Sequence, residues 1–221
     1  MIDVIRGGAI LLMIFYHLVF DLNFFRLVAV PFIGSPYWIG FAKCIVFLFL
    51  ICVGMGLALS HKDGIRWNRV IKRFFKIGGW AVIITIVTCL LLPKNFIYFG
   101  ILHCIAATSV AGAFFVRWPR LCLILSILLF IPDLIYEPKI LSLSERLGVH
   151  PADYIPFYPW FGVVLFGIYL ESIHFHKIQL RQNVAIRSLE ALGRHSLKIY
   201  LLHQPIMMGL LFLILKLAKD I

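Results

Sequence analysis

The chain is organised as long hydrophobic runs separated by short polar segments. In a helix, about 20 apolar residues cross the ~30 Å hydrocarbon core of a bilayer. A chain in hydrocarbon must satisfy its own backbone hydrogen bonds, which leaves helices or a closed barrel. Because the runs show no strand-like alternation, we predict helices over the segments 4–27, 37–60, 74–92, 97–116, 120–136, 158–174 and 192–217.

The segments between these runs are too short to fold as separate domains. The longest, 137–157, predicts a cap or an interfacial helix, and the sequence shows no internal repeat. Composition agrees with a membrane protein, since 62% of residues are hydrophobic, 14% are charged and mean hydropathy is +0.98. Soluble domains are nearer half apolar and one quarter charged. We therefore expect an all-α polytopic membrane helix bundle of about seven transmembrane helices, with residues 1–221 forming a single domain.

The net charge of +11 raises the question of a nucleic-acid partner. Its basic residues lie between the hydrophobic runs, as in the positive-inside pattern of membrane proteins, so no nucleic acid is expected. With a cytoplasmic N-terminus and an outer C-terminus, twelve basic residues face inward and six outward, which favours this orientation. The inner set is Lys62, Arg66, Arg69, Lys72, Arg73, Lys76, Arg117, Arg120, Lys177, Arg181, Arg187 and Arg194. The outer set is Arg26, Lys94, Lys139, Arg146, Lys216 and Lys219.

Metal and disulfide chemistry find no support in the sequence. The five cysteines are scattered through apolar segments without CxxC spacing, which indicates small core residues. The stretch "HFHK" at 174–177 has no carboxylate or cysteine companion. We therefore expect no metal.

Four polar residues of the first hydrophobic run share one helical face. With about 100° per residue and Arg6 at zero, His17 falls at about 20°, and Asp3 and Asp21 at about 60°. Ionisable residues inside membrane spans usually face a cavity or a partner helix and mark a functional path. Asp21 lies one turn from His17 and could orient its imidazole. The alternative is structural, with Asp3 and Arg6 at headgroup level and His17 and Asp21 in a helix–helix contact.

The spacing of this stripe and two later stretches carry a resemblance to a known enzyme class. Arg6 and His17 in "RGGAILLMIFYH" match the R-x10-H signature of membrane acyltransferases of the acyltransferase family 3 type. The stretch "FLFLICVGMGLALS" (47–60) resembles their second helix, although Val53 stands where serine is usual, and "LGRHSLKIYLLHQP" (192–205) resembles their late helix.

The short length and further stretches bring the chain closer to a sister group of that class. These are "IDVIRGGAILLMIFYH" (2–17), "YFGILH" (98–103) and "PFYPWFGVVLFGI" (156–168). The chain is thereby similar to bacterial relatives of heparan-alpha-glucosaminide N-acetyltransferase. Val28 stands where that enzyme's proposed catalytic histidine aligns. The mechanism is therefore carried over from the acyltransferase 3 type.

The resemblance implies an integral membrane acyltransferase in the bacterial cytoplasmic (inner) membrane. Its donor would be cytoplasmic acyl-CoA, in the first place acetyl-CoA, and its acceptor a sugar amine or hydroxyl of a glycan or a lipid-linked sugar. Such a transfer needs a general base, a role for which histidine is suited because its pKa lies near neutrality. We expect His17 to be the base, Asp21 to orient it, and His103 to be a second catalytic or donor-side histidine.

Binding roles fall to residues at the cytoplasmic end and in the last helix. Arginine suits the phosphates of coenzyme A because its guanidinium binds them with two parallel hydrogen bonds. We expect Arg6 in this role, Arg194 on either a phosphate or an anionic lipid, and Ser196, Tyr200 and His203 lining the substrate.

Two other functions remain open from the sequence. A small transporter or flippase would use His17 and Asp21 as a proton relay, and a non-catalytic subunit would keep only the fold. Transporters more often show paired repeats. Further expected partners are membrane lipids and a second copy of the chain in a homodimer.

Overall fold

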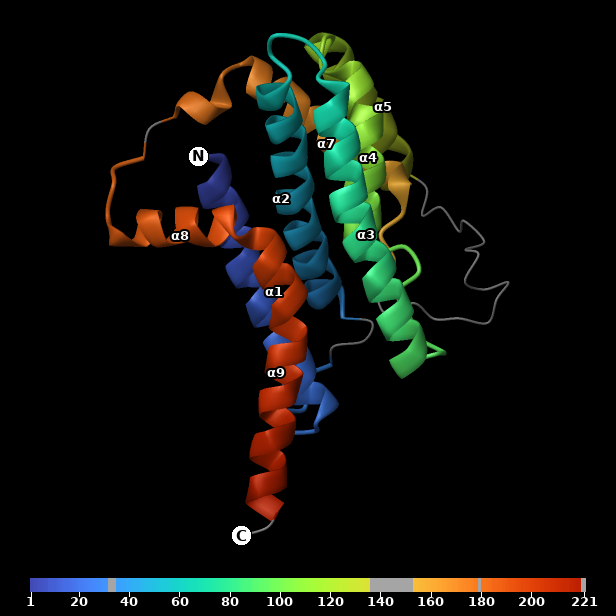
Figure 1. Cartoon of the computed structure of the whole chain (residues 1–221), viewed down its shortest axis with the longest axis vertical. Coiled ribbons are helices and arrows are strands. Elements are labelled where there is room, and N and C mark those ends of the chain that lie inside the picture. Colours follow the sequence, from blue (N-terminus) through green and yellow to red (C-terminus); the bar gives the residue numbers. More distant parts are fainter. Residues whose placement is uncertain (32–34, 136–152, 179, 220–221) are drawn as a thin grey trace. The chain divides into compact units, whose positions relative to one another are not determined.

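The computed structural model describes residues 1–31, 35–135, 153–178 and 180–219. Within these ranges the chain is helical and contains no strand (Figure 1). The α-helices are α1 (Ile2–Phe24), α2 (Pro36–Ser60), α3 (Trp67–Leu91), α4 (Ile101–Phe115), α5 (Pro119–Ile135), α7 (Phe157–Ser172), α8 (Val184–Arg194) and α9 (Ser196–Lys219). A short 3-10 helix, η1, spans Phe175–Lys177. The predicted all-α membrane fold is confirmed.

Each predicted hydrophobic segment contains a helix, but two boundaries differ. The predicted last helix is divided at His195, where α8 ends and α9 begins. The predicted third helix begins earlier, at Trp67, because its first turns have an apolar face even though they carry many charges. Among the described residues, α1, α2, α3 and α9 are long and apolar enough to cross a membrane. The number of spans stays a prediction, and most of the polar stretch 137–157 lies outside the described residues.

The chain forms two compact units. Unit 1 consists of Met1–Phe49 and His176–Ile221, so it joins the first and last parts of the sequence. Unit 2 is Leu50–Phe175, and the boundary falls inside α2. The organisation of both units as a single domain stays a prediction.

In unit 1, α8 crosses α1 at very close range because two glycines leave room. A Cβ atom on Gly7 would overlap the carbonyl of Leu189, and one on Gly193 would overlap the carbonyl of Asp3. Helix α8 is strongly amphipathic. Its first turn is capped by Asn183, whose side-chain oxygen accepts a hydrogen bond of 2.9 Å from the backbone N–H of Ile186.

After α8 the chain bends sharply into α9, which runs beside α1 (Figure 1). Contacts advance together along both helices, from His17 with His203 to Asp21 with Gln204. The two helices are therefore parallel. If both cross the bilayer, the chain makes an odd number of crossings from α1 to α9, in agreement with the predicted seven.

In unit 2, α7 packs against α4 and α5, and α3 packs against α4. The second half of α2 approaches α7 closely, because Cβ atoms on Gly54 and Gly167 would overlap the carbonyls of Val164 and Ile51. The interior is apolar. It includes Leu50, Met55, Leu57, Ala113, Val163, Val164, Leu165 and Ile168.

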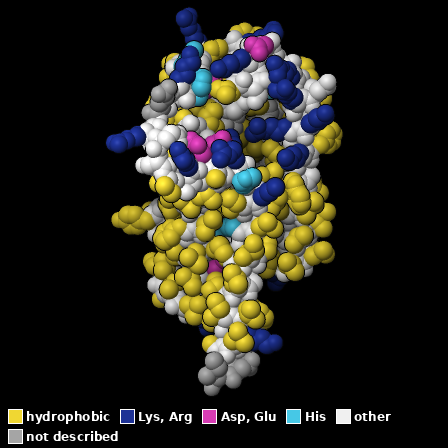
Figure 2. All heavy atoms as spheres, turned by 60° about the vertical axis from the view of Figure 1, so that its left-hand side comes forward, with side chains coloured by type: hydrophobic (Ala, Val, Ile, Leu, Met, Phe, Trp, Pro, Cys, Tyr) yellow, Lys and Arg dark blue, Asp and Glu magenta, His cyan; other side chains and the backbone are white. Residues whose placement is uncertain are grey.

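Large apolar side chains also cover outer faces, as expected where lipid replaces water. On α9 they include Ile206, Leu210, Phe212, Leu213, Ile214 and Leu217. Figure 2 shows hydrophobic side chains covering the lower part of this helix. Helix α3 exposes Leu90 and Leu91 in the same way. Both helices thus present apolar surface suited to hydrocarbon.

The close crossing of α1 and α8 predicts opposite effects for two neighbouring substitutions. Gly7→Ala should destabilise the protein by about 1–3 kcal/mol, because its Cβ meets backbone that cannot move aside easily. Gly8→Ala is the matched control, since nothing lies within 4 Å of its Cβ. It should be neutral or stabilising by up to about 1 kcal/mol through helix propensity. Thermal unfolding of both purified variants in detergent measures the difference. Equal shifts would contradict the packing described.

The predicted orientation is tested at the two ends of α3. Gly64 is unsuitable for labelling because its φ of +123° disfavours any other residue. In a background without native cysteines, exposed Asn68→Cys should react with a membrane-impermeant reagent only after cells are permeabilised. Exposed Lys94→Cys, beyond the other end of α3, should react in intact cells. The reverse pattern would place the N-terminus outside.

Candidate functional site

Polar side chains of α1 and α9 meet in the interior of unit 1. Gln204 Nε2 donates a hydrogen bond of 2.7 Å to Asp21 Oδ1, although the two residues are 183 positions apart. Beside this pair, the rings of His17 and His203 are in edge contact, with centroids 4.8 Å apart and an interplanar angle of 75°. We call these four residues the α1–α9 polar cluster. The structure therefore brings together the predicted site residues His17, Asp21 and His203, and adds Gln204.

The hydrogen bonds of the two histidines indicate which nitrogen of each carries its proton. His17 Nδ1 lies 2.9 Å from the carbonyl oxygen of Met13, and His203 Nδ1 lies 2.7 Å from that of Tyr200. A carbonyl oxygen can only accept, so each Nδ1 must donate. In the neutral rings, this leaves a lone pair on both Nε2 atoms. Both histidines are thus oriented by backbone, with Nε2 left to act as an acceptor or a base.

Three atoms of the α1–α9 polar cluster are buried without a hydrogen-bond partner among the described residues. They are Asp21 Oδ2, His203 Nε2 and Gln204 Oε1. Asp21 is wholly buried, at 0% exposure. Leaving such a group unsatisfied costs about 1–3 kcal/mol, so native proteins rarely gather several without a functional reason. Together with His17 Nε2, these atoms can accept hydrogen bonds from the N–H or O–H donors of water or of a ligand.

Pro205 follows directly after Gln204 in the interior of α9. Proline has no backbone N–H, so the helix loses the hydrogen bond that would run from this position to the carbonyl of Leu201. Gln204 was not among the site residues predicted from the sequence. The available signal was a second polar side chain beside His203, inside an apolar run and immediately before a helix-interrupting proline.

The other predicted residues of unit 1 lie toward the start of α1 or next to His203. Arg6 Nη1 donates to Asp3 Oδ1 at 3.0 Å. Because Gly193 packs against Asp3, exposed Arg194 lies at the same end of α1. In α9, the Tyr200 ring contacts that of His203, with centroids 5.8 Å apart. Ser196, at the start of α9, lies one helical turn before Tyr200 and is therefore further from the cluster.

His103 belongs to unit 2, where both of its ring nitrogens have partners. Nδ1 accepts the backbone N–H of Gly100 at 3.3 Å, so Nε2 carries the proton and lies 3.3 Å from the Thr85 hydroxyl oxygen. These contacts join the start of α4 to α3. Asp153 completes this end of α4 by accepting a hydrogen bond from the N–H of Ile101. The arrangement accounts for His103 as a structural residue, and its catalytic role stays a prediction.

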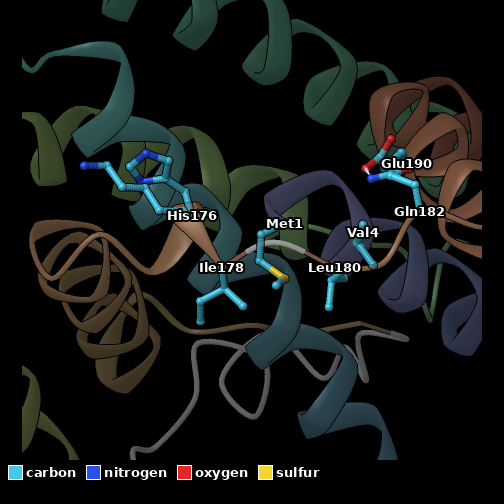
Figure 3. A pocket seen from close by; sticks show the side chains of 8 residues that line it. Met1, Val4, His176, Ile178, Leu180, Gln182 and Glu190 are labelled. Atoms are coloured by element: carbon cyan, nitrogen blue, oxygen red, sulfur yellow. Dashed lines mark hydrogen bonds between the residues drawn. The ribbon is translucent and has the colours of Figure 1, made fainter.

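A cavity of about 530 Å³ opens at the N-terminal end of α1 in unit 1 (Figure 3). Its wall is formed by Met1, Val4, His176, Lys177, Ile178, Leu180, Gln182 and Glu190. One side is polar, because Gln182 Nε2 donates to Glu190 Oε1 at 3.4 Å. None of the predicted site residues lines it, although Val4 is two positions from Arg6. Among the described residues, no group of three His, Cys, Asp or Glu side chains could hold a metal ion.

A family model for the heparan-alpha-glucosaminide N-acetyltransferase catalytic region matches residues 1–205. The chain belongs to this family. The match covers parts of both units and ends one residue after Gln204, so it contains the whole α1–α9 polar cluster. No curated protein and no solved structure matches the chain.

Family membership confirms the part of the predicted resemblance that concerned heparan-alpha-glucosaminide N-acetyltransferase. The R-x10-H relation to acyltransferase family 3 and the bacterial source stay predictions. In this member of the family, His17 and His203 face each other across parallel helices, and Val28 is partly exposed.

The hydrogen bond between Gln204 and Asp21 predicts a measurable coupling between α1 and α9. Gln204→Leu should lower the free energy of unfolding by about 1–3 kcal/mol, because it leaves Asp21 Oδ1 buried and unpaired. Asp21→Leu combined with Gln204→Leu should cost less than the sum of the single changes, since neither polar group remains. Reversible unfolding in mixed micelles gives the four values of this double-mutant cycle.

The matched control is Gln182→Leu, an identical change at an exposed position. It should alter the free energy of unfolding by less than about 0.5 kcal/mol. Additive effects at positions 21 and 204 would show that the hydrogen bond does not join the helices.

Proposed function

We propose that the protein transfers an acyl group, acetyl in the first place, from cytoplasmic acyl-CoA to a sugar amine or hydroxyl of a glycan or glycolipid. The observation that carries this proposal is the α1–α9 polar cluster, whose unpaired atoms accept hydrogen bonds inside membrane-length helices. Sugar amines and hydroxyls supply the missing donors. Membership of an N-acetyltransferase family supports the same chemistry and favours an amine.

In the proposed reaction, His17 Nε2 is the general base. The acceptor nitrogen or oxygen forms a bond to the thioester carbonyl carbon, and the bond from this carbon to the coenzyme A sulfur breaks. The acceptor's proton passes to His17 Nε2 and then to the departing thiolate. His203 Nε2 and Asp21 Oδ2 would hold the acceptor's remaining donors. The Met13 carbonyl, which accepts from His17 Nδ1, keeps the ring in the tautomer that this role requires.

The donor would enter from the end of α1 that holds Arg6 and Arg194. Arg6 and His17 are eleven positions apart in the helix, a rise of about 16 Å. The pantetheine arm of coenzyme A likewise separates its phosphates from its thioester. Phosphates bound by Arg6 at the cytoplasmic face would therefore place the reacting carbon deeper along α1. This geometry fits the proposed inner-membrane location with a cytoplasmic N-terminus.

A transporter or flippase is the second candidate, because His17, His203 and Asp21 form a contiguous set of titratable groups within spanning helices. Acetyl-CoA separates the two functions. A ligand that binds only the folded protein raises its apparent stability. Millimolar acetyl-CoA should raise the melting temperature of the acyltransferase in detergent. It should leave the melting temperature of a transporter unchanged.

The acyltransferase proposal predicts separate effects for His17 and Arg6 on transfer from labelled acetyl-CoA in membranes. His17→Gln should lower kcat by about 10²–10⁴-fold, the usual contribution of a positioned base, and leave stabilisation by coenzyme A intact. Arg6→Ala should instead weaken coenzyme A binding and raise KM. Arg6→Lys should restore binding only in part, because the two-pronged phosphate contact is lost.

Two further histidines serve as comparisons. His174 is exposed at the end of α7, so His174→Gln should transfer acetyl groups at the wild-type rate. His103→Gln tests the second predicted catalytic histidine. If it abolishes transfer while His17→Gln keeps near-normal activity, the base is His103 and the role proposed for the α1–α9 polar cluster is wrong.

A further inference from the structure

Cationic side chains gather around the turn between α2 and α3 in unit 2. The turn is tight because Gly64 adopts a φ of +123°, which allows α3 to begin at Trp67. Spacings of three and seven residues then place Arg66, Arg69 and Arg73 on one face of the first turns of α3.

A buried histidine lies beneath this face. His61 is 5% exposed, and its Nδ1 accepts the backbone N–H of Arg66 at 3.2 Å. Its pKa is lowered first by burial and then by the charges of Arg66, Arg69 and Arg73. The three guanidinium groups are therefore close enough to one centre to act on it together.

A fourth arginine reaches the same turn from another part of unit 2. Arg117 lies between α4 and α5, and its Nη2 is 3.9 Å from the position of a Cβ atom on Gly64. We call Arg66, Arg69, Arg73 and Arg117, with His61 beneath them, the α3 arginine cluster. Its side chains come from three segments of unit 2, namely the turn between α2 and α3, the first turns of α3, and the connection between α4 and α5.

Among the described residues, two acidic side chains form ion pairs at this turn. Asp63 pairs with Arg66 at 3.5 Å, but the Asp63 side chain is 84% exposed, where such pairs contribute little. Glu171 is buried and pairs with Lys62 at 3.6 Å. With Lys62 included, the five cationic side chains of this region exceed these two carboxylates in charge.

Apolar packing fixes the direction in which this charge faces. Trp67, Val70, Ile71 and Phe74 lie on the other side of α3, along a groove of about 520 Å³ shared with α4. Val70 is buried there, and the rings of Trp67 and Phe114 are 4.8 Å apart. Helix α3 cannot rotate to disperse its arginines without exposing Val70 and separating Trp67 from Phe114. The positive-inside rule explains the number of basic residues but not their convergence on one side.

We propose that the α3 arginine cluster binds a phosphate group. Arginine recognises phosphate through planar, paired N–H donors, and several converging guanidinium groups match the charge of a phosphate dianion. The phosphate can belong to an anionic lipid headgroup or to a soluble phosphate compound. The site is independent of the proposed acyl transfer, because no residue of the α1–α9 polar cluster takes part.

Two probes distinguish the sources. Inorganic pyrophosphate is added to the purified protein in detergent, with chloride matching the ionic strength, and the melting temperature is measured. Retention of phosphatidylglycerol is compared with that of phosphatidylcholine by native mass spectrometry after release from mixed nanodiscs. A response to pyrophosphate assigns a soluble phosphate compound, and selective retention of phosphatidylglycerol assigns a lipid. No response in either arm overturns the proposal.

Charge-removing variants locate the effect. Arg69→Gln combined with Arg73→Gln should weaken binding of the responding probe at least tenfold. Arg69→Lys with Arg73→Lys should weaken this binding less. Lys43→Gln with Lys94→Gln removes two positive charges elsewhere and should bind as wild type does. Arg117→Gln changes only an exposed side chain, so it tests the site even if the first pair fails to fold. Wild-type binding by the Arg117 variant and by each folded pair at positions 69 and 73 would overturn the assignment.

Discussion

In hydrocarbon no water is present to satisfy a polar group, so each such group in a spanning helix needs a partner within the protein or its ligand. The hydrogen bond from Gln204 to Asp21 meets that demand for only one oxygen of a wholly buried carboxyl. The same bond sets the register of α9 against α1 and brings His203 beside His17. The remaining unpaired atoms are the ones to which the proposed acceptor would donate its hydrogen bonds.

Backbone contacts orient the side chains of this interior without a substrate. Two carbonyls in the helices orient the two imidazoles, and close glycine contacts hold α8 across α1. The ring nitrogens of His17 in unit 1 and of His103 in unit 2 have different surroundings. His17 keeps an open ring nitrogen, whereas His103 uses one nitrogen to cap its own helix at Gly100 and the other to contact Thr85 in α3.

Much of the fold follows from hydrophobic run length, because a bilayer requires helices of a set length. The face shared by Arg6, His17 and Asp21 was equally predictable from the helical period. The break at His195 was not, because no proline marks it and the amphipathic helix α8 leads directly into the apolar helix α9. Nor was the pairing of Asp21 with Gln204, which depends on which helices become neighbours. Composition cannot specify a contact between residues 183 positions apart.

The discontinuous make-up of unit 1 has a consequence for biogenesis. Helix α1 carries a histidine and an aspartate in its apolar run, and it leaves the ribosome well before the α9 segment that completes their surroundings. At roughly 5–20 residues per second, Asp21 precedes Gln204 by roughly 10–40 s of synthesis. During that interval the insertion machinery, a snorkelling position or a temporary helix neighbour must shelter the carboxyl. The cluster assembles only after the chain between Asp21 and Gln204 has been translated.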